Sequence, residues 1–128
     1  MSAADAGQLP ETIARMFRAI ESGDFDGLRT CFTPDGVVWH NIDEKAEDLD
    51  AVCTNLGNMV GISDKVAYTD VSTTTVGNQT FAQHVLVADL KSGKQLRLPA
   101  MMRIETNDDG LITRIDEYFD SGRLAVLA

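Results

Sequence analysis

The apolar pattern of this chain changes once, near Ser63, from helical spacing to strand-like alternation. Three segments before that point, residues 10–22, 25–32 and 49–60, carry apolar side chains at intervals of three and four residues. This spacing places them on one face of an α-helix. The rest of the chain is rich in β-forming residues and is interrupted by Gly- and Asp-containing turns, as in antiparallel strands. Helices gathered before a meander of strands predict an α+β domain with three helices packed on one face of a curved, mostly antiparallel sheet.

The predicted sheet has five strands, and two polar segments interrupt the chain before its meander. The strands are expected at residues 37–42, 66–76, 81–90, 95–106 and 111–119. Residues 33–36 are expected to form a turn, and the acidic residues 43–50 a solvated loop that leads into the third helix. The tail is expected to pack back through Leu124, Val126 and Leu127. Helices over a curved sheet predict a conical, apolar cavity, and the other face of the sheet is expected to be covered in a homodimer.

Composition limits the classes of function. The 128 residues predict one domain, residues 10–128, after a flexible arm, residues 1–9. A formal net charge of −9 disfavours nucleic acid and anionic membranes as partners. The only histidines are His40 and His84, too few for a multi-histidine zinc site. The two cysteines predict no disulfide framework, and no apolar run approaches the ~20 residues of a membrane span. We therefore expect a cytoplasmic protein that needs no metal or cofactor and binds a small apolar molecule.

Two motifs resemble one family. The segments AIESGDFDGL (residues 19–28) and CFTPDGVVWHN (residues 31–41) resemble the opening of SnoaL-like proteins, which belong to the nuclear-transport-factor-like superfamily of conical α+β domains. The ending DGLITRIDEYFD (residues 109–120) resembles the last strand of the same family. The resemblance implies the cone-shaped (cystatin-like) fold. It does not imply one activity, because the superfamily includes cyclases, isomerases, epoxide hydrolases, dehydratases and non-enzymes.

The limonene epoxide hydrolases of this superfamily suggest one set of site residues. Their catalytic aspartate falls on Glu117, and their water-positioning tyrosine and asparagine fall on Trp39 and Asn41. Their central Arg-x-Asp pair falls on Gln83 and Val85, so the ion pair that activates water in that mechanism is absent here.

The ketosteroid isomerases suggest a second set. Their base falls on His40, and their two oxyanion donors fall on Met16 and Ala100, neither of which donates a strong hydrogen bond. Because side chains alternate across a strand, either His40 or the pair Trp39 and Asn41 enters the cavity. The terminal Tyr-Phe-Asp match to the hydrolases favours Trp39 and Asn41.

Glu117 is the strongest candidate for acid/base chemistry. It alternates with Ile115 and Phe119, so an inward register places one carboxylate on an apolar face, where burial would raise its pKa. The opposite register would bury Arg114 and Asp116 and leave Glu117 in solvent. The predicted catalytic residues are Glu117, Asn41 and His40. The predicted substrate-binding residues are Trp39, Met16, Phe17, Met59, Gln83, Val85, Ala100, Met102 and Phe119.

Three further polar residues, His84, Tyr68 and Asp70, are expected outside the cavity. If Gln83 points inward, then His84 points to the dimer face or the surface. Tyr68 and Asp70 share a strand face, and we expect an exposed cross-strand pair rather than part of a polar pocket.

The functional hypothesis is a cofactor-independent enzyme. It would act on an apolar, oxygenated substrate such as a polyketide or terpenoid, by acid/base cyclisation, isomerisation or epoxide opening. The alternative is a non-catalytic ligand-binding or dimerisation module of the same fold.

Overall fold

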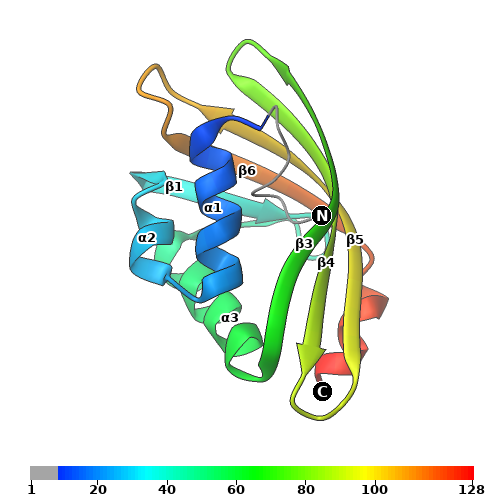
Figure 1. Ribbon diagram of the computed structural model, residues 1–128. Helices are drawn as coiled ribbons and strands as arrows, with labels where there is room; N and C mark the ends of the chain where they lie inside the picture. Colours follow the sequence, from blue (N-terminus) through cyan, green and yellow to red (C-terminus); the bar gives the residue numbers. More distant parts are fainter. Residues whose placement is uncertain (1–8) are drawn as a thin grey trace.

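The computed structural model describes residues 9–128, which form three α-helices, six strands and a C-terminal 3-10 helix (Figure 1). The elements follow in the order α1 (Glu11–Ser22), α2 (Phe25–Arg29), β1 (Phe32–His40), β2 (Lys45–Asp48), α3 (Leu49–Gly61), β3 (Ser63–Val76), β4 (Gln79–Leu90), β5 (Gln95–Thr106), β6 (Ile112–Phe119) and η2 (Ser121–Leu127). The expected arm lies outside the described residues except for Leu9, which packs against the core.

The six strands form one sheet in the order β2-β1-β6-β5-β4-β3. All neighbours are antiparallel except β1 and β6, which run parallel. The long strands β3, β4 and β5 curve strongly, and α1, α2 and α3 lie on their concave side (Figure 1). The predicted α+β architecture with a curved, mostly antiparallel sheet is confirmed.

The first two helices follow directly from local sequence. Pro10 precedes α1, and Gly23 ends it with a left-handed φ of 72°, a conformation that costs glycine little. Asp24 then caps α2 by accepting a hydrogen bond from the Gly27 N–H at 2.9 Å. The apolar stripe of α1, including Ile13 and Phe17, is buried against the sheet. Burial of this stripe holds α1 over the concave face.

Two expectations about residues 33–50 are wrong. Residues 33–36 do not form a separate turn but lie within β1, where the register with β6 shifts between Phe32 and Val37. The acidic stretch is not all loop, since Lys45–Asp48 form β2 at the edge of the sheet. Charged residues disfavour strands in general, but an edge strand keeps such side chains in solvent.

A bulge in β3 separates Tyr68 from Asp70. The register with β4 shifts between Thr69 and Ser72, and Asp70 has a φ of 53°. The bulge breaks the simple alternation of side chains. Tyr68 is therefore buried beneath the helices, whereas Asp70 is exposed and its Oδ2 lies 4.0 Å from Arg97 Nη2. The expectation that they share an exposed face is wrong.

Candidate active site

A cavity of about 390 Å³ lies between the helices and the concave face of the sheet. Its wall is mainly apolar, and the tail closes part of it through Leu124 and Leu127. Several residues expected at the wall line it, namely Met16, Met59, Ala100, Met102 and Phe119. The volume suits a small organic molecule.

A histidine and a glutamate meet inside this cavity. β1 and β6 pair so that His40 lies beside Glu117. His40 Nε2 is 3.2 Å from Glu117 Oε1, and the two side chains are 20% and 16% exposed. Glu117 thus faces inward, as its alternation with Ile115 and Phe119 predicts. A half-buried histidine and carboxylate in contact can hold and transfer a proton.

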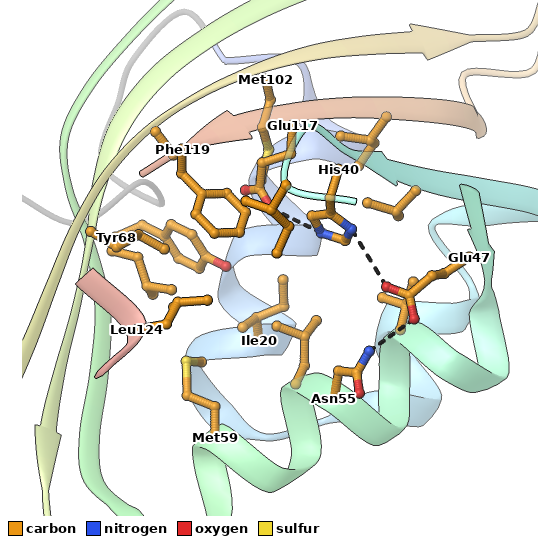
Figure 2. A pocket seen from close by; sticks show the side chains of 18 of the residues that line it. Ile20, His40, Glu47, Asn55, Met59, Tyr68, Met102, Glu117, Phe119 and Leu124 are labelled. Carbon is orange, nitrogen blue, oxygen red and sulfur yellow. Dashed lines mark hydrogen bonds and ion pairs between the residues drawn. The ribbon is translucent and has the colours of Figure 1, made fainter. Parts of the chain in front are cut away.

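The other side of the His40 ring faces a second carboxylate. His40 Nδ1 lies 3.5 Å from Glu47 Oε1, and Glu47 Oε2 accepts a hydrogen bond from Asn55 Nδ2 at 2.9 Å (Figure 2). The His40 ring also packs against Phe119 in a T-shaped arrangement, with ring centroids 5.9 Å apart. The imidazole is therefore contacted at both nitrogen atoms and by one aromatic ring.

These carboxylates favour the protonated imidazole. The hydrogen bond to Glu117 is the main cause that raises the pKa of His40, and the charges of Glu117, Glu47 and Asp43 add to it. Burial opposes the rise but is outweighed. The His40–Glu117 pair can therefore exist as an imidazolium beside a carboxylate.

His40 is expected to stabilise the fold most at low pH. Its pKa is raised on folding, so its contribution is complete below the unfolded value of about 6.5 and is lost as pH rises through the folded value. Urea unfolding of the wild type and of His40→Gln, between about pH 5 and about pH 9, measures this contribution. A stability difference between the two proteins that stays constant over this range would contradict the assignment.

Asn41 and Trp39 do not line the cavity, so the expectation that they enter it is wrong. The Asn41 amide donates to the Phe119 carbonyl at 3.2 Å and accepts from the Phe119 N–H at 3.0 Å. It extends the pairing of β1 with β6 by one residue. Trp39 packs against Tyr118, with ring centroids 5.4 Å apart. Because directly paired residues point to the same face, an inward Glu117 brings His40 inward and turns Trp39 outward.

The side chains of β4 that point into the cavity are also the opposite set from the one expected. Gln83 and Val85 lie on the outer face of the sheet, and His84 is buried at 2% exposure and lines the cavity. The assignments of Gln83 and Val85 to the cavity wall, and of His84 to the dimer face or surface, are wrong. Both faces of β4 carry apolar residues, so alternation alone does not distinguish them. The concave face takes the set that includes Ala82 and Leu86.

Sequence reasoning missed an aromatic cluster around His84. The rings of Tyr68 and His84 lie 5.2 Å apart between centroids, and Phe17 packs against both. Phe17 is fully buried and does not line the cavity, in contrast to its expected role in substrate binding.

Burial lowers the pKa of His84 and raises that of Tyr68, so both side chains are uncharged near neutral pH. The inward position of Tyr68 was missed because strict alternation places Tyr68 on the same face as Asp70, which is exposed. The bulge after Tyr68 breaks that alternation.

Two further properties concern the described part of the chain. Within residues 9–128, no three His, Cys, Asp or Glu side chains gather closely enough to hold a metal ion. None of the helices in this range is both long and apolar enough to cross a membrane.

The family of this chain follows from its sequence, and the fold of helices over a curved sheet around a cavity agrees with it. The chain matches the SnoaL-like domain profile over residues 13–115. It therefore belongs to the SnoaL-like domain family. A comparison with curated proteins gave no significant match.

Solved structures share the fold at low sequence identity. A protein of ketosteroid isomerase-like fold from Catenulispora acidiphila, in complex with trimethylamine, superposes with a TM-score of 0.77 at 17% identity, covering 92% of each chain. IdmH, a candidate polyketide cyclase from Streptomyces antibioticus, gives a TM-score of 0.77 at 18% identity, covering 91% of this chain and 96% of its own. A candidate polyketide cyclase from Silicibacter sp. TM1040 gives a TM-score of 0.71 at 22% identity, covering 88% of each chain. At these identities the likeness establishes the fold.

Proposed function

We propose that this protein is a cofactor-independent cyclase or isomerase that acts on an apolar, oxygenated small molecule such as a polyketide or terpenoid. The observation that carries the proposal is the His40–Glu117 pair within an otherwise apolar cavity. Candidate polyketide cyclases among the structural neighbours support the substrate class. Epoxide opening is less well supported, because Gln83 and Val85 occupy the positions of the hydrolases' Arg-x-Asp pair and lie outside the cavity.

The proposed chemistry is proton transfer at a carbon next to a carbonyl group. Glu117 accepts the proton, and the adjacent His40 imidazolium offsets negative charge in the site. Glu47, which accepts a hydrogen bond from Asn55, lies against the far side of the imidazole. If the substrate carries a β,γ double bond, the enolate is a dienolate, and return of the proton from Glu117 to its γ-carbon completes an isomerisation. If the enolate carbon instead attacks a second carbonyl of the same molecule, a ring forms, and the new alkoxide takes the proton back from Glu117.

The charges at the cavity disfavour an anionic substrate. Three carboxylates, those of Asp43, Glu47 and Glu117, line the cavity, and no Lys or Arg among residues 9–128 does so. A ligand carboxylate or phosphate would meet like charge in a partly buried site. We therefore assign ketones, esters or lactones, rather than free acids, as the substrate class.

Hydrogen–deuterium exchange at β-tetralone tests the proposed function without knowledge of the natural substrate. This bicyclic ketone is apolar and uncharged, and NMR in D₂O follows the loss of its α-protons. The wild-type protein is expected to accelerate the exchange in a saturable manner. Saturable binding of the ketone with exchange at the buffer rate would contradict the enzyme proposal and support the binding-module alternative.

The outer face of the sheet is a candidate surface for a second copy of the chain. Phe81, Met101 and Tyr118 are 39%, 43% and 50% exposed, and they lie on this face beside Trp39 and Val85. Met101 pairs with Tyr118, so the exposed apolar residues are contiguous from β5 to β6, and Phe81 of β4 lies on the same face opposite Arg103. Large exposed apolar patches of this kind mark interaction surfaces.

The double substitution Met101→Glu with Tyr118→Glu is expected to convert a dimer into a monomer, because dimer formation would then bury like charges on this face. Light scattering coupled to size exclusion should give twice the 13.9 kDa chain mass for the wild type and the single mass for the variant. Ile62→Glu, at an exposed apolar residue beyond α3, is the control and should stay dimeric. A monomeric wild type would contradict the homodimer.

A further inference from the structure

We propose that Tyr68 and His84 form a second polar site in the cavity, which binds an uncharged carbonyl oxygen of the ligand. This inference rests on the proposed function, because it assumes an oxygenated ligand. It adds the residues that would recognise the oxygen while His40 and Glu117 act on a neighbouring carbon.

The two polar sites come from different parts of the sheet. His40 and Glu117 lie on β1 and β6, whereas Tyr68 and His84 lie on β3 and β4. In Figure 2, His40 and Tyr68 enter the pocket from opposite sides, with Glu117 and Phe119 between them. A ligand can therefore contact both sites at once.

A small side chain keeps the space between the sites open. Ala100 of β5 pairs with His84 on one side and with Phe119 on the other, and it lines the cavity. A larger side chain at this position would fill the floor between the two sites. The two positions that carry oxyanion donors in ketosteroid isomerases correspond here to Met16 and Ala100, so any donors in this cavity must come from other residues.

Both members of the second site have a side-chain polar atom without a hydrogen-bond partner within residues 9–128. His84 is 2% exposed, and its Nδ1 is buried with no hydrogen-bond partner among residues 9–128. The Tyr68 hydroxyl points into the pocket (Figure 2), and none of the hydrogen bonds found within the described residues involves it. Buried polar groups without partners cost free energy, which a bound polar atom would recover.

The cluster is rigid and uncharged. Phe17 packs against both rings, with centroids 4.5 Å from Tyr68 and 5.5 Å from His84. The Tyr68 N–H donates to Glu21 Oε2 at 2.9 Å, which fixes the backbone of β3 at this point. Burial keeps the Tyr68 phenol protonated and the His84 imidazole neutral, since it raises the first pKa and lowers the second. A phenol O–H and a neutral imidazole N–H suit a carbonyl oxygen, and they can also stabilise the charge that develops on it when an enolate forms.

Binding of the fluorescent naphthyl ketone Prodan tests the proposal, with dimethylaminonaphthalene as the matched probe that lacks the carbonyl. Tyr68→Phe removes only the hydroxyl and is expected to weaken Prodan binding about fivefold to tenfold, with no change for the carbonyl-free probe. The emission of bound Prodan should also shift to shorter wavelength, because its carbonyl loses a hydrogen bond. His84→Phe, which keeps an aromatic ring, is expected to change binding in the same direction.

The chain offers a matched control, since its other tyrosine lies on the outer face. Tyr118→Phe should leave the affinities for both probes unchanged. Equal weakening of both probes by Tyr68→Phe would show a packing role and overturn the proposal, as would unchanged Prodan affinity or the absence of saturable Prodan binding to the wild type. Glu117→Gln is expected to retain the preference for Prodan even where proton exchange is lost, so binding and turnover report separately on the second site and on the proposed function.

Discussion

Replacement of Glu117 by glutamine is expected to lower the protein-catalysed exchange of β-tetralone protons by about two to four orders of magnitude. Glutamine has the shape of glutamate but cannot accept a proton at this position. Because Glu117 is held against His40 in a partly buried site, water does not readily replace it. The rate is measured by NMR at saturating ketone, so that weaker binding does not imitate a loss of chemistry.

The same variant has a second consequence that needs no substrate. The hydrogen bond to Glu117 is the largest cause of the raised pKa of His40, so Glu117→Gln should lower this pKa. NMR titration of the His40 ring measures it directly. Glu105→Gln is the control, since Glu105 pairs with Arg103 away from His40. An exchange rate in Glu117→Gln equal to that of the wild type would remove Glu117 from the mechanism.

Replacement of Phe17 by alanine is expected to lower the free energy of unfolding by about 3–5 kcal/mol. Phe17 is fully buried, and its ring packs against both Tyr68 and His84. Its removal leaves a void between α1 and the sheet that these rings do not fill without moving. Urea unfolding, with an unchanged dependence on denaturant, measures the loss.

Ile62→Ala is the control for this prediction. Ile62 lies beyond α3, away from the proposed dimer face, and is 42% exposed, so its truncation creates no closed cavity and should cost much less than Phe17→Ala. A loss below about 1 kcal/mol in Phe17→Ala would contradict the view that this residue is a structural support. It would instead be consistent with the wall position expected from the sequence.

Local chemistry accounts for most of the fold that could be predicted. Helical spacing in α1 and α3, the cap at Asp24 and the turns between the long strands each depend on residues close in sequence, and each is present in the structure. The strand β2 was missed because its charged residues disfavour a strand unless one edge faces solvent. That condition depends on its position beside β1, which no local pattern specifies.

The candidate site was predicted less completely, for a related reason. Sequence by itself determined that Glu117 alternates with Ile115 and Phe119, which favours the register in which one carboxylate faces the core. It could not determine which of His40 and Asn41 joins this carboxylate, because alternation ties residues within a strand but not between strands. The parallel register of β1 with β6 decided it, by placing His40 beside Glu117. The bulge in β3 and the curvature of β4 likewise decided that Tyr68 and His84 face the cavity, since only the folded sheet defines a concave side.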